Sequence, residues 1–100
     1  MIKKNMKMVM LVYNHALDDE MFDVLKESGI THYTKVEGVT GSGDSGPHMG
    51  TNIWPAINNM LFIAVDPGQL KTLHAAGKEL AEKFPGEGMR GFMFTLAEMW

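Results

Sequence analysis

Two short apolar runs, residues 6–13 and 60–65, constrain this chain more than any other feature, because neither run alternates apolar with polar side chains. An antiparallel strand with one face in water alternates in that way, so a nearly continuous apolar run is typical of a strand covered on both faces. By length the 100 residues form a single domain, 1–100, with one modest core. Such a chain has little left to cover a second face of its sheet.

Two helices and two further strands are predicted around these runs. The first helix follows residue 17 and has Asp18, Asp19 and Glu20 in its first turn, where carboxylates favour the helix dipole, and Gly29 as its stop. The second starts at Asp66-Pro67-Gly68-Gln69, which combines a capping carboxylate, a first-position proline and a glutamine three residues on. Residues 30–39 and 88–96 are predicted as strands. The apolar faces of the two helices comprise Leu17, Met21, Val24, Leu25 and Ser28, and Leu70, Leu73, Gly77, Leu80 and Phe84.

The resulting β-α-β-β-α-β order predicts an α+β, ferredoxin-like fold: a four-stranded antiparallel sheet with two helices on one face. The other face of the sheet is then open. Because the strands at 6–13 and 60–65 are apolar on that face too, packing of one sheet on another in an oligomer is the simplest way to cover it.

Composition excludes several classes of function. The chain has no cysteine, which rules out disulfides, zinc–thiolate sites and iron–sulfur clusters. Its net charge of −3, with Arg90 as the single arginine, argues against nucleic acid as a partner. The apolar run near the start is too short to span a membrane and has no small-residue cleavage site, so we expect a cytoplasmic protein that does not insert into membranes.

The glycine-rich segment 38–58 is the first candidate binding region. A hairpin loop usually has ~2–5 residues, and much longer loops are usually functional or disordered. The segment holds a tryptophan, which a purely solvated loop rarely exposes, although a merely flexible insertion is the alternative interpretation. Its candidate ligand-binding residues are Gly41, Asp44, His48, Thr51, Asn52 and Trp54.

A second candidate is the turn Gly86-Glu87-Gly88-Met89-Arg90. Closely spaced glycines allow the backbone to approach a phosphate, and an arginine can bind it with two hydrogen bonds. An ordinary helix-to-strand turn would explain the glycines about as well. The candidate ligand-binding residues here are Gly86, Gly88 and Arg90.

Metal binding and catalysis have weaker signals. His15, His32, His48 and His74 show no spacing that pairs two ligands on one helix or strand, and His48 is the tentative metal ligand if a metal binds. The ten methionines fit core or interface packing better than a soft-metal site. There is no cysteine nucleophile and no G-x-S-x-G motif, so no catalytic residue is assigned and we expect a protein that is not an enzyme.

The element order, the long loop TGSGDSGPHMGTNIWP followed by NNMLFIAV, and the glycine turn before the last strand resemble the PII-like signal-transduction superfamily, which includes the CutA proteins. The resemblance covers nearly the whole chain. It implies a homotrimer whose sheets face one another around a central axis. Residues 38–58 then match the T-loop, which docks on target proteins. Gly86, Gly88 and Arg90 match the B-loop turn that grips a nucleotide, although PGEGMR lacks the threonine of the family pattern and has its basic residue displaced.

This resemblance implies a trimeric regulator that binds a nucleotide or another small anion at subunit clefts and signals through the 38–58 loop to a partner, such as a membrane transporter. One alternative is a metal-binding protein of CutA type that uses His48 with Asp44 or His32. Another is a small enzyme of the dimeric ferredoxin-like barrel type, which would also cover the open sheet face.

Overall fold

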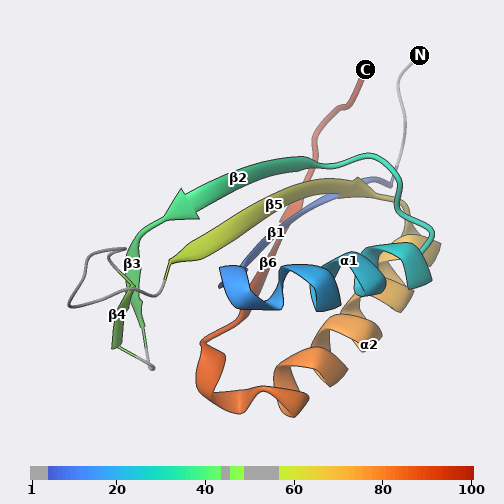
Figure 1. Ribbon diagram of the computed structural model, residues 1–100. Helices are drawn as coiled ribbons and strands as arrows, with labels where there is room; N and C mark the ends of the chain where they lie inside the picture. Colours follow the sequence, from blue (N-terminus) through green and yellow to red (C-terminus); the bar gives the residue numbers. More distant parts are fainter. Residues whose placement is uncertain (1–4, 44–45, 49–56) are drawn as a thin grey trace.

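The computed structural model describes residues 5–43, 46–48 and 57–100 (Figure 1). Its helices and strands follow in chain order: β1 (Lys7–Asn14), the 3-10 helix η1 (His15–Leu17), α1 (Asp18–Glu27), β2 (Thr34–Val39), β3 (Gly41–Gly43), β4 (Gly46–His48), β5 (Asn58–Val65), α2 (Pro67–Lys83), the 3-10 helix η2 (Pro85–Glu87) and β6 (Arg90–Thr95). Strands β2, β5, β1 and β6 lie in that order in one antiparallel sheet. Both α-helices cover the same face of it (Figure 1), which confirms the predicted fold class.

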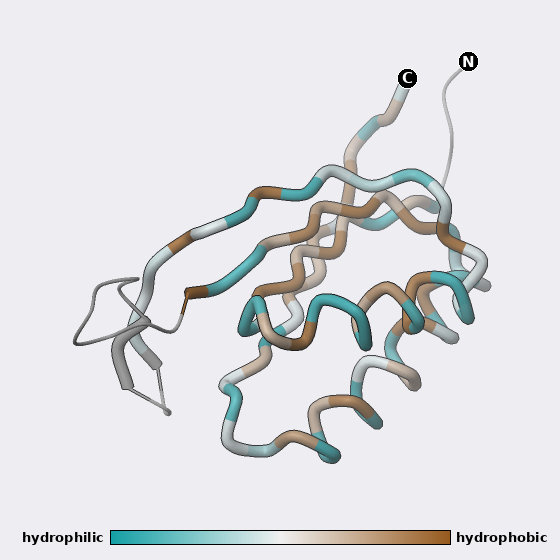
Figure 2. The backbone as a smooth tube through the Cα atoms, in the orientation of Figure 1, coloured by the Kyte–Doolittle hydropathy of each residue, from teal (hydrophilic) through white to brown (hydrophobic). Residues whose placement is uncertain are grey.

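The strand register separates two faces of the sheet. On the helix side, Val9 lies opposite Ile63 and Met93, and Leu11 opposite Leu61. These side chains, with those of the helices, form the core, and Figure 2 shows the hydrophobic stretches along both central strands. The buried apolar residues of the core are Val9, Leu11, Tyr13, Leu17, Met21, Val24, Leu25, Ile30, Leu61, Ile63, Val65, Leu73, Ala76 and Leu80.

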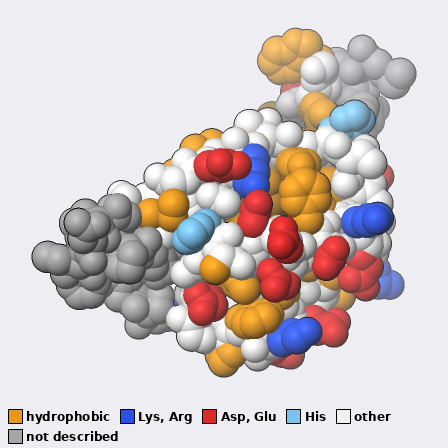
Figure 3. Space-filling model, viewed as in Figure 1, with side chains coloured by type: hydrophobic (Ala, Val, Ile, Leu, Met, Phe, Trp, Pro, Cys, Tyr) orange, Lys and Arg blue, Asp and Glu red, His pale blue; other side chains and the backbone are white. Residues whose placement is uncertain are grey.

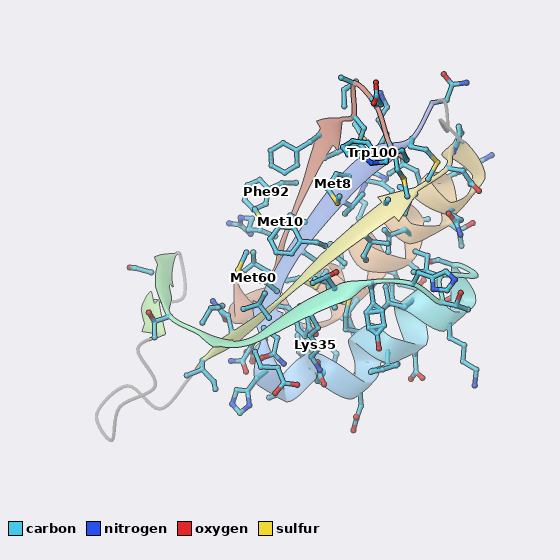
Figure 4. The ribbon with its side chains drawn as sticks, turned by 90° about the horizontal axis from the view of Figure 1, so that it is seen from above. Met8, Met10, Lys35, Met60, Phe92 and Trp100 are labelled. Atoms are coloured by element: carbon cyan, nitrogen blue, oxygen red, sulfur yellow. The ribbon has the colours of Figure 1, made fainter. Side chains whose placement is uncertain are left out.

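The opposite face of the sheet is also apolar. Met10 lies opposite Phe62 on β5 and Phe92 on β6, and Met8 lies opposite Phe94. Figure 4 views this face from the side away from the helices. Phe92 is 45% exposed and Phe94 50% exposed. The sequence pattern therefore predicted the two-faced sheet correctly. The C-terminal residues after β6 rise over one end of this second face, with Trp100 near Met8 in Figure 4, but Trp100 is 90% exposed, so they do not bury it.

The helix boundaries follow from local sequence signals. Asp66 and Gln69 form the predicted capping box: the Asp66 carboxylate accepts from the Gln69 amide at 2.8 Å, and the Gln69 side chain accepts from the Asp66 amide at 3.2 Å. Gly29 ends α1 at φ 67°, a left-handed conformation that glycine adopts without strain. Ser28, on the apolar face of α1, satisfies its buried hydroxyl by donating to the Val24 carbonyl at 2.8 Å.

The structure corrects two of the predicted segments. The second strand begins at Thr34 rather than at residue 30, because Ile30 turns into the core instead of joining the ladder. The 38–58 segment is not one irregular loop, since β3 and β4 within it pair in a short two-stranded sheet. Glycines at 41, 43 and 46 hid this pairing, because they carry no side chain that could show a strand period.

Candidate functional site: an apolar groove ending at a glycine turn

A groove of about 390 Å³ runs between α2 and the edge strand β6. The helices do not fully cover this strand, so Met93 is 58% exposed although it lies on the helix side of the sheet. Gly77 contributes no side chain to the space between helix and strand, and a Cβ built on it would meet no atom within 4 Å. The residues that line the groove include Val9, Leu11, Leu70, Leu73, His74, Gly77, Lys78, Ala81, Met89, Gly91, Phe92 and Met93.

The predicted glycine turn lies at one end of this groove. Gly86 is part of η2, and Gly88 follows it at φ 67°, again in the left-handed region. Met89 and Gly91 on either side of Arg90 both line the groove. The exposed Arg90 begins β6, and its Nη1 donates to the Met89 carbonyl oxygen at 3.0 Å. The structure thus brings Gly86, Gly88 and Arg90 together beside an apolar hollow, which the sequence did not reveal.

The residues predicted in the long loop are only partly described. Gly41 and His48 lie opposite each other in the backbone register of β3 and β4. Asp44, Thr51, Asn52 and Trp54 lie outside the described residues. Within the described ranges, His15, His32 and His74 lie on separate segments, and no group of three or more His, Asp or Glu residues there could hold a metal ion.

A polar cluster that the sequence did not predict lies at the base of this loop. The Asp18 carboxylate accepts from the Tyr13 hydroxyl at 2.6 Å, from Lys35 Nζ at 2.5 Å and from Asn59 Nδ2 at 3.2 Å. Asn59 in turn accepts from the backbone amide of Gly38 at 3.2 Å. The cluster therefore joins β1, α1, β2 and β5 just where β2 and β5 lead into the 40–57 segment.

Burial and charge set the ionisation of this cluster. Partial burial would by itself raise the pKa of Asp18, but the hydrogen bonds from Lys35, Tyr13 and Asn59 outweigh it and hold that pKa below its usual value. The same ion pair raises the pKa of Lys35, and burial together with the Asp18 carboxylate raises the pKa of Tyr13 well above its usual value. Asp18 is thus ionised, with Tyr13 neutral and Lys35 charged, at neutral pH.

The sequence analysis explained Asp18 only as a first-turn carboxylate that favours the helix dipole, and the structure confirms that it stands in the first turn of α1. Its partners come from positions 5, 17 and 41 residues away. The one signal of this cluster in the sequence was a charged residue, Lys35, within a predicted strand. The structure places Lys35 on the helix side of the sheet, opposite the buried Leu61. A hollow of about 370 Å³ adjoins the cluster, lined by His15, Asp18, Glu37, Gly38, Ile57 and Asn59.

The glycine turn at residues 86–90 and the polar cluster around Asp18 lie at the same end of the sheet. Arg90 is opposite Val12, and Asn58 is opposite Asn14, so the start of β6 and the start of β5 both lie at the carboxyl end of β1. Figure 1 shows β3 and η2 at this end. The described part of the chain contains no helix long and apolar enough to cross a membrane.

Comparison with solved structures gives the same fold repeatedly. CPII, a nitrogen regulatory PII-like protein from Thiomonas intermedia K12, bound to ADP, AMP and bicarbonate, is 19% identical, with a TM-score of 0.77 over 94% of this chain and 87% of that one. The apo form of CPII is 19% identical, with a TM-score of 0.73 over 99% and 97% of the two chains. A Pediococcus pentosaceus ATCC 25745 protein of unknown function is 12% identical, with a TM-score of 0.62 over 98% of each chain.

Among curated proteins no sequence matches this chain. The family model described as nitrogen regulatory protein P-II, however, matches residues 6–98, which include both halves of the sheet, both helices and the glycine turn. The chain belongs to the nitrogen regulatory protein P-II family.

Proposed function

We propose that this P-II family protein is a non-enzymatic, homotrimeric sensor that binds an adenine nucleotide, with or without a second small anion, at a cleft between subunits. Binding would change the 38–58 loop, which engages a partner such as a membrane transporter. The observation that carries the proposal is the apolar groove that ends at the Gly86–Arg90 turn.

The groove and the turn together fit the two chemical halves of a nucleotide. A flat heterocycle can lie between aliphatic side chains such as those of Leu11, Leu73 and Met89, which line the groove. The phosphates would then lie at the glycine turn, where backbone amides and the Arg90 guanidinium can bind them. Lys78 on the groove lining adds a second positive charge. CPII, which has the same fold, is bound to ADP, AMP and bicarbonate in its solved structure.

The trimer is supported by the apolar face opposite the helices. Phe62 and the three methionines Met8, Met10 and Met60 are only half-buried within one chain, beside the exposed Phe92 and Phe94. A contiguous apolar surface of this kind is typical of an interface. A threefold arrangement would also bring the edges of neighbouring sheets close together. The glycine turn at residues 86–90 and the polar cluster around Asp18 would then lie near a subunit boundary.

Replacing Arg90 by alanine should weaken ADP binding at least tenfold, because a charged hydrogen bond to phosphate contributes about 1.5–3 kcal/mol and each tenfold in affinity is about 1.4 kcal/mol. Isothermal titration calorimetry with ADP, AMP, ATP and bicarbonate measures this directly. Lys71→Ala is the matched control, since it removes one exposed cation from α2 outside the groove lining. Equal affinities for the wild type and Arg90→Ala would show that the turn does not hold the phosphates.

Leucine at position 77 should fill the groove without disturbing the fold. The space beside Gly77 is open, and leucine favours a helix over glycine by up to about 1 kcal/mol. We therefore expect Gly77→Leu to melt at the same temperature as the wild type or higher, yet to bind ADP at least tenfold more weakly. Gly77→Ala, which adds one methyl group, serves as the control for the backbone change. A leucine variant that binds ADP normally would place the nucleotide elsewhere.

A further inference from the structure

One aromatic side chain is half-exposed at the edge between α1 and β2, and neither the apolar sheet face nor the groove includes it. Phe22 on α1 is 49% exposed. It does not lie there as an isolated side chain, because its ring packs edge-on against Tyr33, with centroids 5.8 Å apart and planes at 88°. Lys35 Nζ lies 6.0 Å from the centroid of the same ring. Phe22 is therefore held in place by its neighbours while half of it faces solvent.

The helix that carries Phe22 is strongly acidic. Helix α1 has five carboxylates and the single Lys26, so it carries a net charge of −4, whereas the whole chain carries −3. On the helix surface Asp19, three residues before Phe22, and Lys26, four residues after it, both lie beside the ring, and Asp23 follows Phe22 directly in the sequence. The charge of Lys35 is already paired with Asp18. Figure 3 shows red carboxylate side chains around hydrophobic ones on this face.

We propose that the face of α1 around Phe22 is a docking surface for a basic amphipathic protein segment, in which lysines or arginines flank large apolar side chains. An aromatic anchor inside a charged rim is the usual anatomy of a protein-binding hot spot. The partner's cations would pair with Asp19 and Asp23, and its apolar side chain would pack on the exposed half of the Phe22 ring.

Charge selects this occupant over three others. A second copy would bring two α1 helices of net charge −4 together, which like-charge repulsion opposes. An anionic lipid surface and a nucleic acid are repelled for the same reason. Because α1 lies on the opposite side of the sheet from the apolar face, packing of another subunit on that face leaves α1 uncovered (Figure 1).

The test is the binding of a fluorescein-labelled peptide of alternating lysine and leucine pairs, measured by fluorescence anisotropy at fixed salt. A peptide of equal charge with serine in place of leucine is the second probe. We expect the leucine peptide to bind at least tenfold more tightly than the serine peptide. Phe22→Ser should remove that tenfold preference in a protein that still folds cooperatively, because half of the ring already faces solvent.

Two double variants distinguish peptide binding at this surface from non-specific attraction of a basic peptide to an acidic protein. Asp19→Asn with Asp23→Asn removes two carboxylates beside Phe22, and Glu79→Gln with Glu82→Gln removes two exposed carboxylates from α2. The first pair should weaken leucine-peptide binding severalfold more than the second. The proposal is overturned if Phe22→Ser binds the peptide as the wild type does, if both charge pairs act equally, or if the protein binds phosphatidylserine vesicles through Phe22.

Discussion

Lysine in place of Met10 should convert the proposed trimer into a folded monomer of 11.1 kDa. Met10 lies at the centre of the apolar face, opposite both Phe62 and Phe92. In one chain its side chain is half-buried, so a lysine can extend its charge into water, and the monomer keeps its core on the helix side. In the proposed trimer that ammonium group would be buried without a partner, at a cost of several kcal/mol per subunit. Light scattering coupled to size-exclusion chromatography measures the mass.

Ala75→Lys is the control for added charge, because Ala75 is exposed on α2. We expect this variant to remain trimeric. A Met10→Lys protein that still has three times the monomer mass would show that the interface lies elsewhere. A wild-type mass of two chains would instead favour the alternative hypothesis from the sequence, a small enzyme of the dimeric ferredoxin-like barrel type.

The sequence predicted the fold well because the decisive signals were local or periodic. The apolar runs of β1 and β5, the capping box at Asp66 and the stop at Gly29 each act within a few residues, and each is present as expected. The β3–β4 pairing was missed because the glycines in these strands have no side chains and so show no alternation of apolar and polar residues. The start of β2 was predicted too early because an apolar residue such as Ile30 is equally compatible with a strand and with a loop residue that packs into the core.

The candidate site could be predicted only in part, since a groove depends on contacts between distant segments. The turn at Gly86, Gly88 and Arg90 was visible as a motif, and the structure confirms that these residues form one turn. Nothing in the sequence indicated that α2 would leave space beside β6, because that space depends on how far the helices reach across the sheet. The Asp18 cluster was hidden for the same reason, as its partners meet only after folding.

Asparagine in place of Asp18 should lower the free energy of unfolding by about 2 kcal/mol, because hydrogen bonds to a charged group contribute about 1.5–3 kcal/mol and this group is partly solvated. The side chain of Asp18 is 31% exposed and that of Lys35 is 19% exposed. The amide would keep an acceptor for Tyr13 but lose the ion pair with Lys35. For a chain of this size the melting temperature should fall by roughly 10 °C. Asp19→Asn, one residue away and exposed, should change it little.

The pH dependence of unfolding distinguishes loss of this ion pair from a general packing defect. The pKa of Asp18 is lower in the folded state than its ordinary value of 3.8, so its stabilising effect is complete above that value and is lost as the pH falls through the folded-state pKa. Lys35 and Tyr13 have raised pKa values, so their contributions hold below about pH 10 and decline as the pH rises further. Denaturant melts at fixed protein concentration should therefore show the wild type losing stability at both ends of the pH range. Asp18→Asn should be less stable at pH 7 and should approach the wild type progressively as the pH falls below 3.8. A constant difference in stability between the two proteins across this range would attribute the defect to packing rather than to the charge of Asp18.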